Sequence, residues 1–466
     1  MVAHISFSPK LATGLALLCL SACASVPKID PAIGHAAVAQ KPRINDRDGA
    51  LSTAEIRRVV DQLTLSPGDD ALLRHHLAIE QAVAGGPLIE GETTDLLKDG
   101  PSTFRAIFAA IAGAKHRIDL EYYIFQDVES DGRHIGDLLL EKRAQGVTVN
   151  IIYDDFGSGV TPGAFFDRLR DAGVNVVKFN PLNPLKSKIG YKPNDRDHRK
   201  ILVVDGTIGI VGGVNLATEY QTVGVARSGP IEHEADRPWR DTDVRVAGPA
   251  VSQLEAIFVE HWRAQKGPAL PDVVQLPNVP GAKGNSVVRF IGSTPDHAVP
   301  RYYATLVSAL RSAEKSITAD AAYFVPTKDE MHALTDAARR GVHVTLILPD
   351  KSNSTFSLAV GHAHYGALLR SGVKIYETRG VVLHSKTVTV DGVWSVIGSS
   401  NFDHRSIVFN DEVDAIVIGS RTADELEAMA AEDRQSATEI SLDHWKHRSI
   451  SERAKEAIGS IWQNLL

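Results

Sequence analysis

Two stretches of the sequence carry the same set of residues that can bind and transfer a phosphoryl group. Each copy reads His-x-Lys, four residues, Asp, six residues, Gly, two residues and Asn. A single His-x-Lys pair is a common surface feature, but two copies in register indicate one shared site. The matching residues are His198, Lys200, Asp205, Gly212 and Asn215, and, 186 positions later, His384, Lys386, Asp391, Gly398 and Asn401.

A cluster of two His, two Lys and two Asn side chains suits a phosphodiester. The Lys and Asn side chains supply donors for the nonbridging oxygens, one neutral imidazole can attack phosphorus, and the other can protonate the leaving alkoxide. The attacking imidazole also needs a partner for its second ring nitrogen, which a carboxylate one strand further along would provide. Asp241 and Glu412 are the candidates, because each stands seven residues before a Gly. We expect no metal ion and no cofactor in this arrangement.

The elements predicted around the motifs alternate between helix and strand. Apolar residues at 104, 107, 108 and 111 have helical spacing, whereas 118–124 and 147–153 are typical of strands. The apolar run between Lys and Asp in each motif predicts a buried strand, with His and Lys on one face of its start. This alternation predicts an α/β fold. Because other landmarks recur as well, such as Gly146-Val147 at Gly341-Val342, the two motif strands are expected to meet across a pseudo-twofold axis.

The composition excludes several classes of protein. The chain has 466 residues, of which 43% are hydrophobic and 23% charged, as in an ordinary globular protein with a packed core. It therefore fits neither a disordered chain nor a bundle of membrane helices. A formal net charge of −7 disfavours a general nucleic-acid-coating protein, which would be basic.

The N-terminal stretch predicts export and lipid attachment. An apolar run over residues 11–20 is too short to span a bilayer but suits the hydrophobic region of a secretory signal. The tetrapeptide Leu-Ser-Ala-Cys that ends at Cys23 resembles the bacterial lipoprotein processing box, in which the cysteine is lipidated and becomes the first residue. A plain signal peptide or a short buried helix is the alternative. Cys19 is the other cysteine of the chain, so cleavage before Cys23 leaves no disulfide to form. Multiple acylation of Cys23 would hold the protein on a membrane surface.

The paired motifs resemble those of the phospholipase D superfamily, and their surroundings resemble its bacterial cardiolipin synthase branch. The stretches that carry this closer resemblance are 323–326, 340–342, 383–387, 398–406 and 410–412. The resemblance implies an α/β protein with two similar phospholipase D-like lobes, each a mixed sheet flanked by helices, related by a pseudo-twofold axis.

The same resemblance assigns roles to the motif residues. His198 would be the nucleophile that forms a phosphohistidine, and His384 would be the general acid. Two features depart from the branch: its transmembrane synthases begin with two hydrophobic helices instead of a short signal, and the first motif has Gly213 where the second has Ser399. The residues expected to bind phosphate are Lys200, Lys386, Asn215, Asn401 and Ser399, with Asp205 and Asp391 supporting the site from within the fold.

These observations predict a phosphatidyltransferase that acts on glycerophospholipids through a phosphohistidine. Hydrolytic phospholipase D and a metal-independent nuclease or phosphodiesterase are the alternatives, and an inactive surface scaffold is disfavoured because both motifs are intact. The expected partners are a phospholipid substrate and a membrane surface, with no nucleic acid, and we expect a monomer. Position 24 is Ala rather than the Asp that retains many lipoproteins at the inner membrane. In a host with two membranes, we therefore expect the protein at the periplasmic face of the outer membrane.

The sequence divides into five predicted segments. These are a signal over 1–22, a tether over 23–50, N-terminal helices over 51–86, a first lobe over 87–275 and a second lobe over 276–466. Ser52 and Glu55 form a predicted capping box at the start of the first helix. The loop from Pro181 to Tyr191 mixes apolar residues with Lys and would either contact anionic lipid or remain solvated. An apolar stripe between Ile450 and Leu465 favours core packing over membrane contact.

Overall fold

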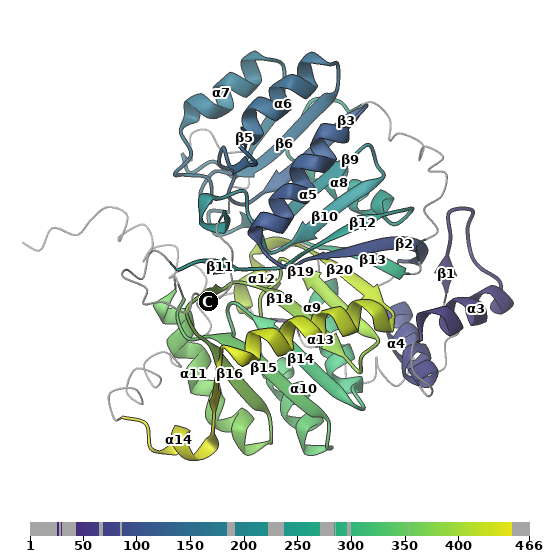
Figure 1. Cartoon of the computed structure of the whole chain (residues 1–466), viewed down its shortest axis with the longest axis vertical. Helices are drawn as coiled ribbons and strands as arrows, with labels where there is room; N and C mark the ends of the chain where they lie inside the picture. Colours follow the sequence, from purple (N-terminus) through teal and green to yellow (C-terminus); the bar gives the residue numbers. More distant parts are fainter. Residues whose placement is uncertain are drawn as a thin grey trace, which may run out of the picture.

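The two sequence repeats form two lobes of similar architecture, the first above the second in Figure 1. This computed structural model describes residues 26–27, 29, 43–64, 69–83, 86–183, 192–221, 237–270, 284, 286–295, 300–352 and 354–449. Each lobe is a mixed β-sheet flanked by helices. The predicted two-lobed α/β fold is therefore confirmed.

The first lobe contains a seven-stranded sheet in the order β2-β12-β10-β9-β3-β6-β7. The predicted helix at 104–111 forms because its apolar residues lie on one face, and all four of them are buried. The strands are β2 (Leu88–Leu97), β3 (Arg117–Tyr122), β6 (Thr148–Asp154), β7 (Asn175–Phe179), β9 (Lys200–Val204), β10 (Ile208–Gly212) and β12 (Asp243–Ala247). The helices are α5 (Gly100–Gly113), α6 (Ile135–Ala144), α7 (Gly163–Asp171) and α8 (Val251–Ala264).

The second lobe repeats this order as β13-β20-β19-β18-β14-β15-β16 and adds β21 at its edge. The strands are β13 (Ser286–Ser293), β14 (Ser316–Ala321), β15 (His343–Pro349), β16 (Lys374–Thr378), β18 (Lys386–Val390), β19 (Trp394–Gly398), β20 (Asn410–Ile418) and β21 (Thr438–Ile440). The helices are α9 (Arg301–Ser312), α10 (Lys328–Arg339), α11 (Thr355–Arg370), α13 (Ser420–Gln435) and α14 (Leu442–Lys446).

Strands β2 and β13 join the two sheets. One half of β2 pairs with β12 of its own lobe, and the other half pairs antiparallel with β13, with Ile89 opposite Val288. β13 in turn pairs with β20 of the second lobe. This reciprocal pairing is the pseudo-twofold relation that the repeats predict. Because β2 belongs to both sheets, the lobes share a continuous hydrogen-bonded junction. The predicted division between residues 275 and 276 lies outside the described residues.

Short elements fill the space where the lobes meet. β8 (Arg196–Asp197) pairs with the start of β20, and β11 (Trp239–Arg240) pairs with β17 (Val382–Leu383). Each of these pairings is parallel and links one repeat to the other. The remaining short elements are the hairpin β4 (Glu129–Ser130) and β5 (Arg133–His134), the 3-10 turn η3 (Thr218–Tyr220) and α12 (His404–Val408).

The N-terminal helices pack on the second lobe, although they precede the first lobe in sequence. α3 (Thr53–Leu63) begins with the predicted capping box of Ser52 and Glu55, and α4 (Asp69–Val83) packs against α9. Glu80 of α4 forms a buried ion pair with Arg289, 2.9 Å apart, and accepts a hydrogen bond from the Trp394 indole. α4 is therefore part of the second lobe's core.

The prediction of a tether over residues 23–50 is wrong where the structure describes them. Ile44 begins strand β1 (Ile44–Asn45), which pairs with β2, and its side chain is fully buried. Ile29 packs with Tyr303 and Ile407 of the second lobe and is 4% exposed. The burial of these two isoleucine side chains stabilises their packed positions, because removal of apolar surface from water lowers the free energy of the folded state.

Several predicted features lie outside the described residues: the signal over 1–22, Cys23, most of the Pro181 loop and the apolar stripe after Ile450. Within the described part of the chain, no helix is both long and apolar enough to span a membrane.

We expect Glu80→Ala to destabilise the protein by about 3–5 kcal/mol, because it leaves the Arg289 guanidinium buried without its counter-charge. Urea unfolding should show a lower midpoint for this variant. Gln62→Ala on the exposed face of α3 is the control and should leave the midpoint nearly unchanged. An unchanged midpoint in Glu80→Ala would contradict the structural importance of the pair.

Candidate active site at the lobe junction

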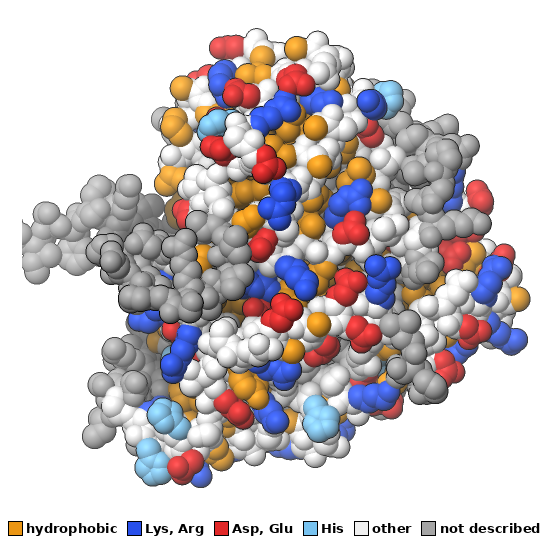
Figure 2. Space-filling view, viewed as in Figure 1, with side chains coloured by type: hydrophobic (Ala, Val, Ile, Leu, Met, Phe, Trp, Pro, Cys, Tyr) orange, Lys and Arg blue, Asp and Glu red, His pale blue; other side chains and the backbone are white. Residues whose placement is uncertain are grey.

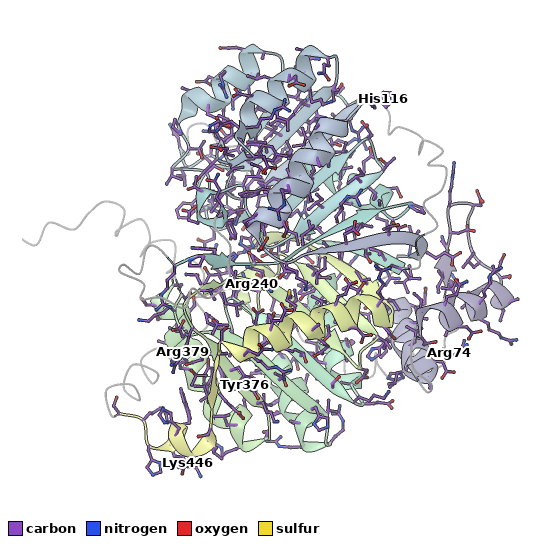
Figure 3. All side chains as sticks on the ribbon, viewed as in Figure 1. Arg74, His116, Arg240, Tyr376, Arg379 and Lys446 are labelled. Carbon is purple, nitrogen blue, oxygen red and sulfur yellow. The ribbon has the colours of Figure 1, made fainter. Side chains whose placement is uncertain are left out.

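The two motif histidines lie at the lobe junction, immediately before β9 and β18. The His198 amide donates to the Asp411 carbonyl at 2.9 Å, and the His384 amide donates to the Arg240 carbonyl at 2.7 Å. Figure 3 shows Arg240 where the two lobes meet. The backbone of the opposite repeat thus positions each histidine. The carbonyl that accepts the histidine amide belongs to the residue just before that repeat's candidate acid, Glu412 or Asp241.

Each imidazole contacts an acid from the opposite repeat. His198 Nδ1 lies 2.9 Å from Glu412 Oε2, and His384 Nδ1 lies 2.7 Å from Asp241 Oδ2. The sequence predicted these two acids as partners, but only the structure assigns each to the other lobe's histidine. An Nδ1–H that donates to the carboxylate leaves Nε2 with a lone pair for chemistry.

Glu412 accepts hydrogen bonds from several neighbours of its own repeat. Ser399 Oγ donates to Glu412 at 2.5 Å, Ser406 Oγ donates at 2.8 Å, and the side-chain Nδ2 of Asn410 donates at 3.1 Å. Ser399 also accepts from the Val413 amide. The expectation that Ser399 binds phosphate therefore needs correction, because its hydroxyl is already used to hold Glu412.

Gly213, the counterpart of Ser399, has no room for a side chain. A Cβ at Gly213 would lie 2.1 Å from Asp241 Oδ1. Asp241 instead accepts from the Thr242 amide at 2.8 Å. The Gly213 departure in the first motif thus has a steric cause, because the carboxylate of Asp241 fills the space beside it.

The two motif lysines are buried at the starts of their strands. Lys200 is 1% exposed and Lys386 is 5% exposed. Each ammonium donates to the carbonyl of its own motif histidine. Burial lowers the pKa of Lys200 to about 7 and that of Lys386 to about 8. Both side chains offer further donors to an anion that enters the junction.

The electrostatics favour neutral imidazoles beside ionised carboxylates. Burial lowers the pKa of His198, against the opposing effect of Glu412. Burial and the Lys386 ammonium lower the pKa of His384 to about 3. Burial alone would raise the pKa of Asp241, but Lys386 and His384 hold it below its ordinary value. A neutral imidazole with an ionised partner is the form that can attack phosphorus.

The two motif asparagines flank the same cluster. Asn215 Oδ1 accepts from the Ile124 backbone amide at 3.1 Å, and the Asn215 side chain also hydrogen-bonds the Tyr220 hydroxyl. The Asn401 amide nitrogen of the backbone donates to Ser406, which also holds Glu412. Their contacts to nonbridging phosphate oxygens stay a prediction.

Asp205 and Asp391 do not reach the site and act only as supports within the fold. Each follows the far end of its motif strand, so Asp205 lies roughly 16 Å along β9 from the Lys200 end. Both adopt positive φ, 52° and 57°, and each carboxylate accepts backbone amides, including His116 N at 2.8 Å and Lys315 N at 2.6 Å. In Figure 3, His116 lies at the outer edge of its lobe, away from Arg240. These aspartates stabilise turns rather than contacting substrate.

Aromatic rings around the histidines were missed by the sequence analysis. The Tyr123 ring lies 5.3 Å from the His198 ring, and Tyr323 and Trp239 lie 5.9 Å and 5.0 Å from the His384 ring. The Tyr220 hydroxyl is 3.0 Å from His384 Nδ1. Tyr123 and Tyr323 follow strands β3 and β14, which pair with the motif strands β9 and β18. This position after a strand that neighbours a motif strand is the sequence feature that could have identified them.

Arg199, between the first motif's His and Lys, points to the opposite face of the strand. It donates to Glu412 O and to Ser293 O, both at 3.2 Å, and lies 3.3 Å from Glu121. A cavity of about 540 Å³ lies on that side, partly lined by Arg199 and His261. Arg199 therefore links three strands beneath the site rather than entering it.

Comparison with known proteins places this geometry in a family. The family model described as cardiolipin synthase, PLD-like domain, matches residues 107–223 and 306–434. Cardiolipin synthase 1 of Bacillus cereus is 32% identical over 84% of this chain and 76% of its own length. Cardiolipin synthase of Geobacillus kaustophilus is 34% identical over 87% of this chain and 78% of its own length. The crystal structure of phosphatidylserine synthase from Haemophilus influenzae superposes with a TM-score of 0.61, at 14% identity, over 83% of this chain and 99% of that one.

The fold and the paired motifs define a member of the phospholipase D superfamily. Within it, the chain belongs to the cardiolipin synthase branch.

The lysine pKa values predict a decline of activity on the alkaline side. As pH rises through about 7 and then 8, Lys200 and Lys386 lose their charges, so kcat/KM for an anionic phosphodiester should fall. Bound phosphate favours the charged lysines, so the decline in kcat should begin at higher pH. The measurement is a pH–rate profile, with Lys446→Gln on the exposed α14 as the control. A decline that begins only near the ordinary lysine pKa, about 10.4, would contradict the lowered values.

Proposed function

We propose that this protein transfers a phosphatidyl group between alcohols at a membrane surface, as a cardiolipin-synthase-like enzyme acting on glycerophospholipids. The observation that carries the proposal is the pair of crossed His–carboxylate contacts, with two buried lysines of lowered pKa beside them. The names of the relatives, cardiolipin synthase and phosphatidylserine synthase, support the substrate class.

In the first half of the reaction, His198 Nε2 attacks phosphorus and the bond to the departing alcohol's oxygen breaks. His384 donates a proton to that alkoxide, so the alcohol leaves neutral. Glu412 stabilises the positive charge that develops on His198. Lys200, Lys386 and the two asparagine amides stabilise the equatorial oxygens.

In the second half, an acceptor alcohol replaces the departed one. His384 accepts its proton, the alkoxide attacks the phosphohistidine, and the P–N bond breaks to restore His198. Water in place of the alcohol gives phosphatidic acid, which is the hydrolytic alternative. Burial keeps His384 neutral in the free enzyme. An anionic phosphate beside Lys386 offsets the ammonium's effect, so substrate binding favours protonation of His384.

A nuclease activity remains the second candidate, because phosphodiester chemistry itself does not distinguish the substrate. The charge distribution favours lipid over nucleic acid. The formal net charge is −7. On the face shown in Figure 2, Lys and Arg are interspersed with Asp and Glu over both lobes, without an extended basic area.

His198→Ala and His384→Ala should each abolish turnover, because one residue carries the phosphoryl group and the other the proton. After quenching in denaturant at alkaline pH, which preserves the P–N bond, mass spectrometry should detect a phosphatidyl adduct on His198. An adduct on His384 would reverse the two roles, and full activity in either variant would refute the mechanism. Circular dichroism is the control for folding.

Phosphatidylglycerol vesicles should yield a diphosphatidyl product by mass spectrometry, and EDTA should leave the rate unchanged. The phosphate donors here are lysines and asparagines rather than an acidic cluster that holds a divalent ion. Phosphatidic acid as the main product would favour the hydrolytic alternative. Cleavage of single-stranded DNA without turnover of the vesicles would favour the nuclease.

We also propose that Cys23 is lipidated and that, in a host with two membranes, the protein faces the periplasm from the outer membrane. The support is the processing-box tetrapeptide and Ala at position 24. Membrane fractionation of Cys23→Ala should move most of the protein to the soluble fraction. Tight membrane binding by this variant would show that another segment is the anchor.

A further inference from the structure

Three large apolar side chains of the described residues are exposed on neighbouring loops. Phe156 is 50% exposed, Val160 76% and Leu182 45%. These residues lie on the loops that follow β6 and β7. Because β6 and β7 are adjacent and parallel, both loops begin at the carboxyl ends of the strands, on the same end of the first lobe's sheet. The Leu182 amide donates to Asp155 Oδ2 at 2.9 Å and ties the two loops together.

The first of these loops is a fixed turn. Asp154 Oδ1 accepts from the amides of Phe156 and Gly157, at 2.8 and 2.9 Å. Ser158 Oγ donates to the Tyr123 carbonyl at 3.1 Å and accepts from the Phe125 amide. Phe156 therefore lies on an ordered turn, and it, Val160 and Leu182 are exposed in the part of the lobe that the structure describes.

This turn adjoins the candidate nucleophile. A Cβ at Gly157 would lie 2.3 Å from the Tyr123 carbonyl, so the loop packs directly on Tyr123, whose ring contacts His198. On the other side, the Arg196 guanidinium lies 5.6 Å from the Phe156 ring centroid, two residues before His198.

Two described residues of the N-terminal segment pack beside α12. Val26 and Ile29 pack in the cluster that includes Ile407 of α12, and the Phe409 carbonyl just beyond α12 accepts the Arg196 amide at 3.2 Å. Cys23 is three positions before Val26, so the length of the chain keeps the proposed lipid anchor within roughly 11 Å of Val26. A series of contacts thus connects Val26, through α12 and Arg196, to the exposed Phe156.

We propose that Phe156, Val160 and Leu182 form a membrane-contact surface that inserts into the interfacial region of a phospholipid bilayer beside the active site. This inference rests on the proposed function and names the surface through which it reaches lipid. Insertion removes exposed apolar area from water. The nearby Lys178 and Arg196 are paired with Asp155 and Asp154, at 2.8 and 3.5 Å, so apolar insertion contributes more than net charge. Binding should therefore depend weakly on salt.

The test compares two forms of one substrate, using full-length protein. Phosphatidylglycerol is offered as long-chain vesicles and as dihexanoyl monomers below their micellar concentration. Phe156→Ser/Val160→Ser should lose at least tenfold in rate on vesicles and stay within twofold of the wild type on monomers. Ala109→Ser/Ala112→Ser, at exposed positions of α5, is the matched control and should match the wild type on both substrates.

Two outcomes would overturn the inference alone: an undiminished rate of the double serine variant on vesicles, or an equal loss on both substrates. If the wild type turns over neither substrate, the proposed function fails, and vesicle co-sedimentation in a Cys23→Ala background decides the membrane contact separately. There, the serine pair should lower the bound fraction severalfold at both low and high salt. An equal bound fraction with and without the serine substitutions would overturn the inference. The same result is expected if the surface binds a protein instead of a bilayer.

Discussion

The crossed contacts between each motif histidine and the opposite repeat's acid determine how this protein is built. Two imidazoles and two ammonium groups are buried together at the lobe junction, which is costly unless carboxylates compensate them. Glu412 and Asp241 supply that compensation from across the junction. Neither lobe alone contains a complete site, so the hydrogen-bonded strands β2 and β13 that join the sheets are as necessary for chemistry as the motifs.

The two halves have diverged within the shared geometry. The second repeat's acid is a glutamate held by Ser399, Ser406 and Asn410, and it faces the more exposed imidazole, His198, at 12%. The first repeat's acid is a shorter aspartate beside Gly213, and its partner His384 is enclosed by Tyr220, Trp239 and Tyr323. The two imidazoles therefore lie in different environments, and burial lowers the pKa of both.

The N-terminal region breaks the symmetry in another way. His76 of α4 contacts Asp391 at 2.9 Å, and Glu80 of the same helix compensates Arg289, so the second lobe's motif strand is supported from outside the repeats. Asp205, which corresponds to Asp391 in the first repeat, is held by the backbone amides of residues 115–117. Val26 and Ile29 of the N-terminal region also pack against Ile407 of α12.

The sequence by itself determined the repeat, the α/β class, the two motifs and the identity of both acids, because these depend on residue type and on local periodicity. It did not determine which acid serves which histidine, since that pairing depends on how two distant strands meet across the junction. Asp205 and Asp391 belong to the motif in sequence, but a five-residue strand carries them to the far end of the sheet. Ile29 and Ile44 stand in a polar, aperiodic stretch, so local pattern predicted a tether. Tertiary structure decided otherwise, because a buried surface far along the chain was available to them.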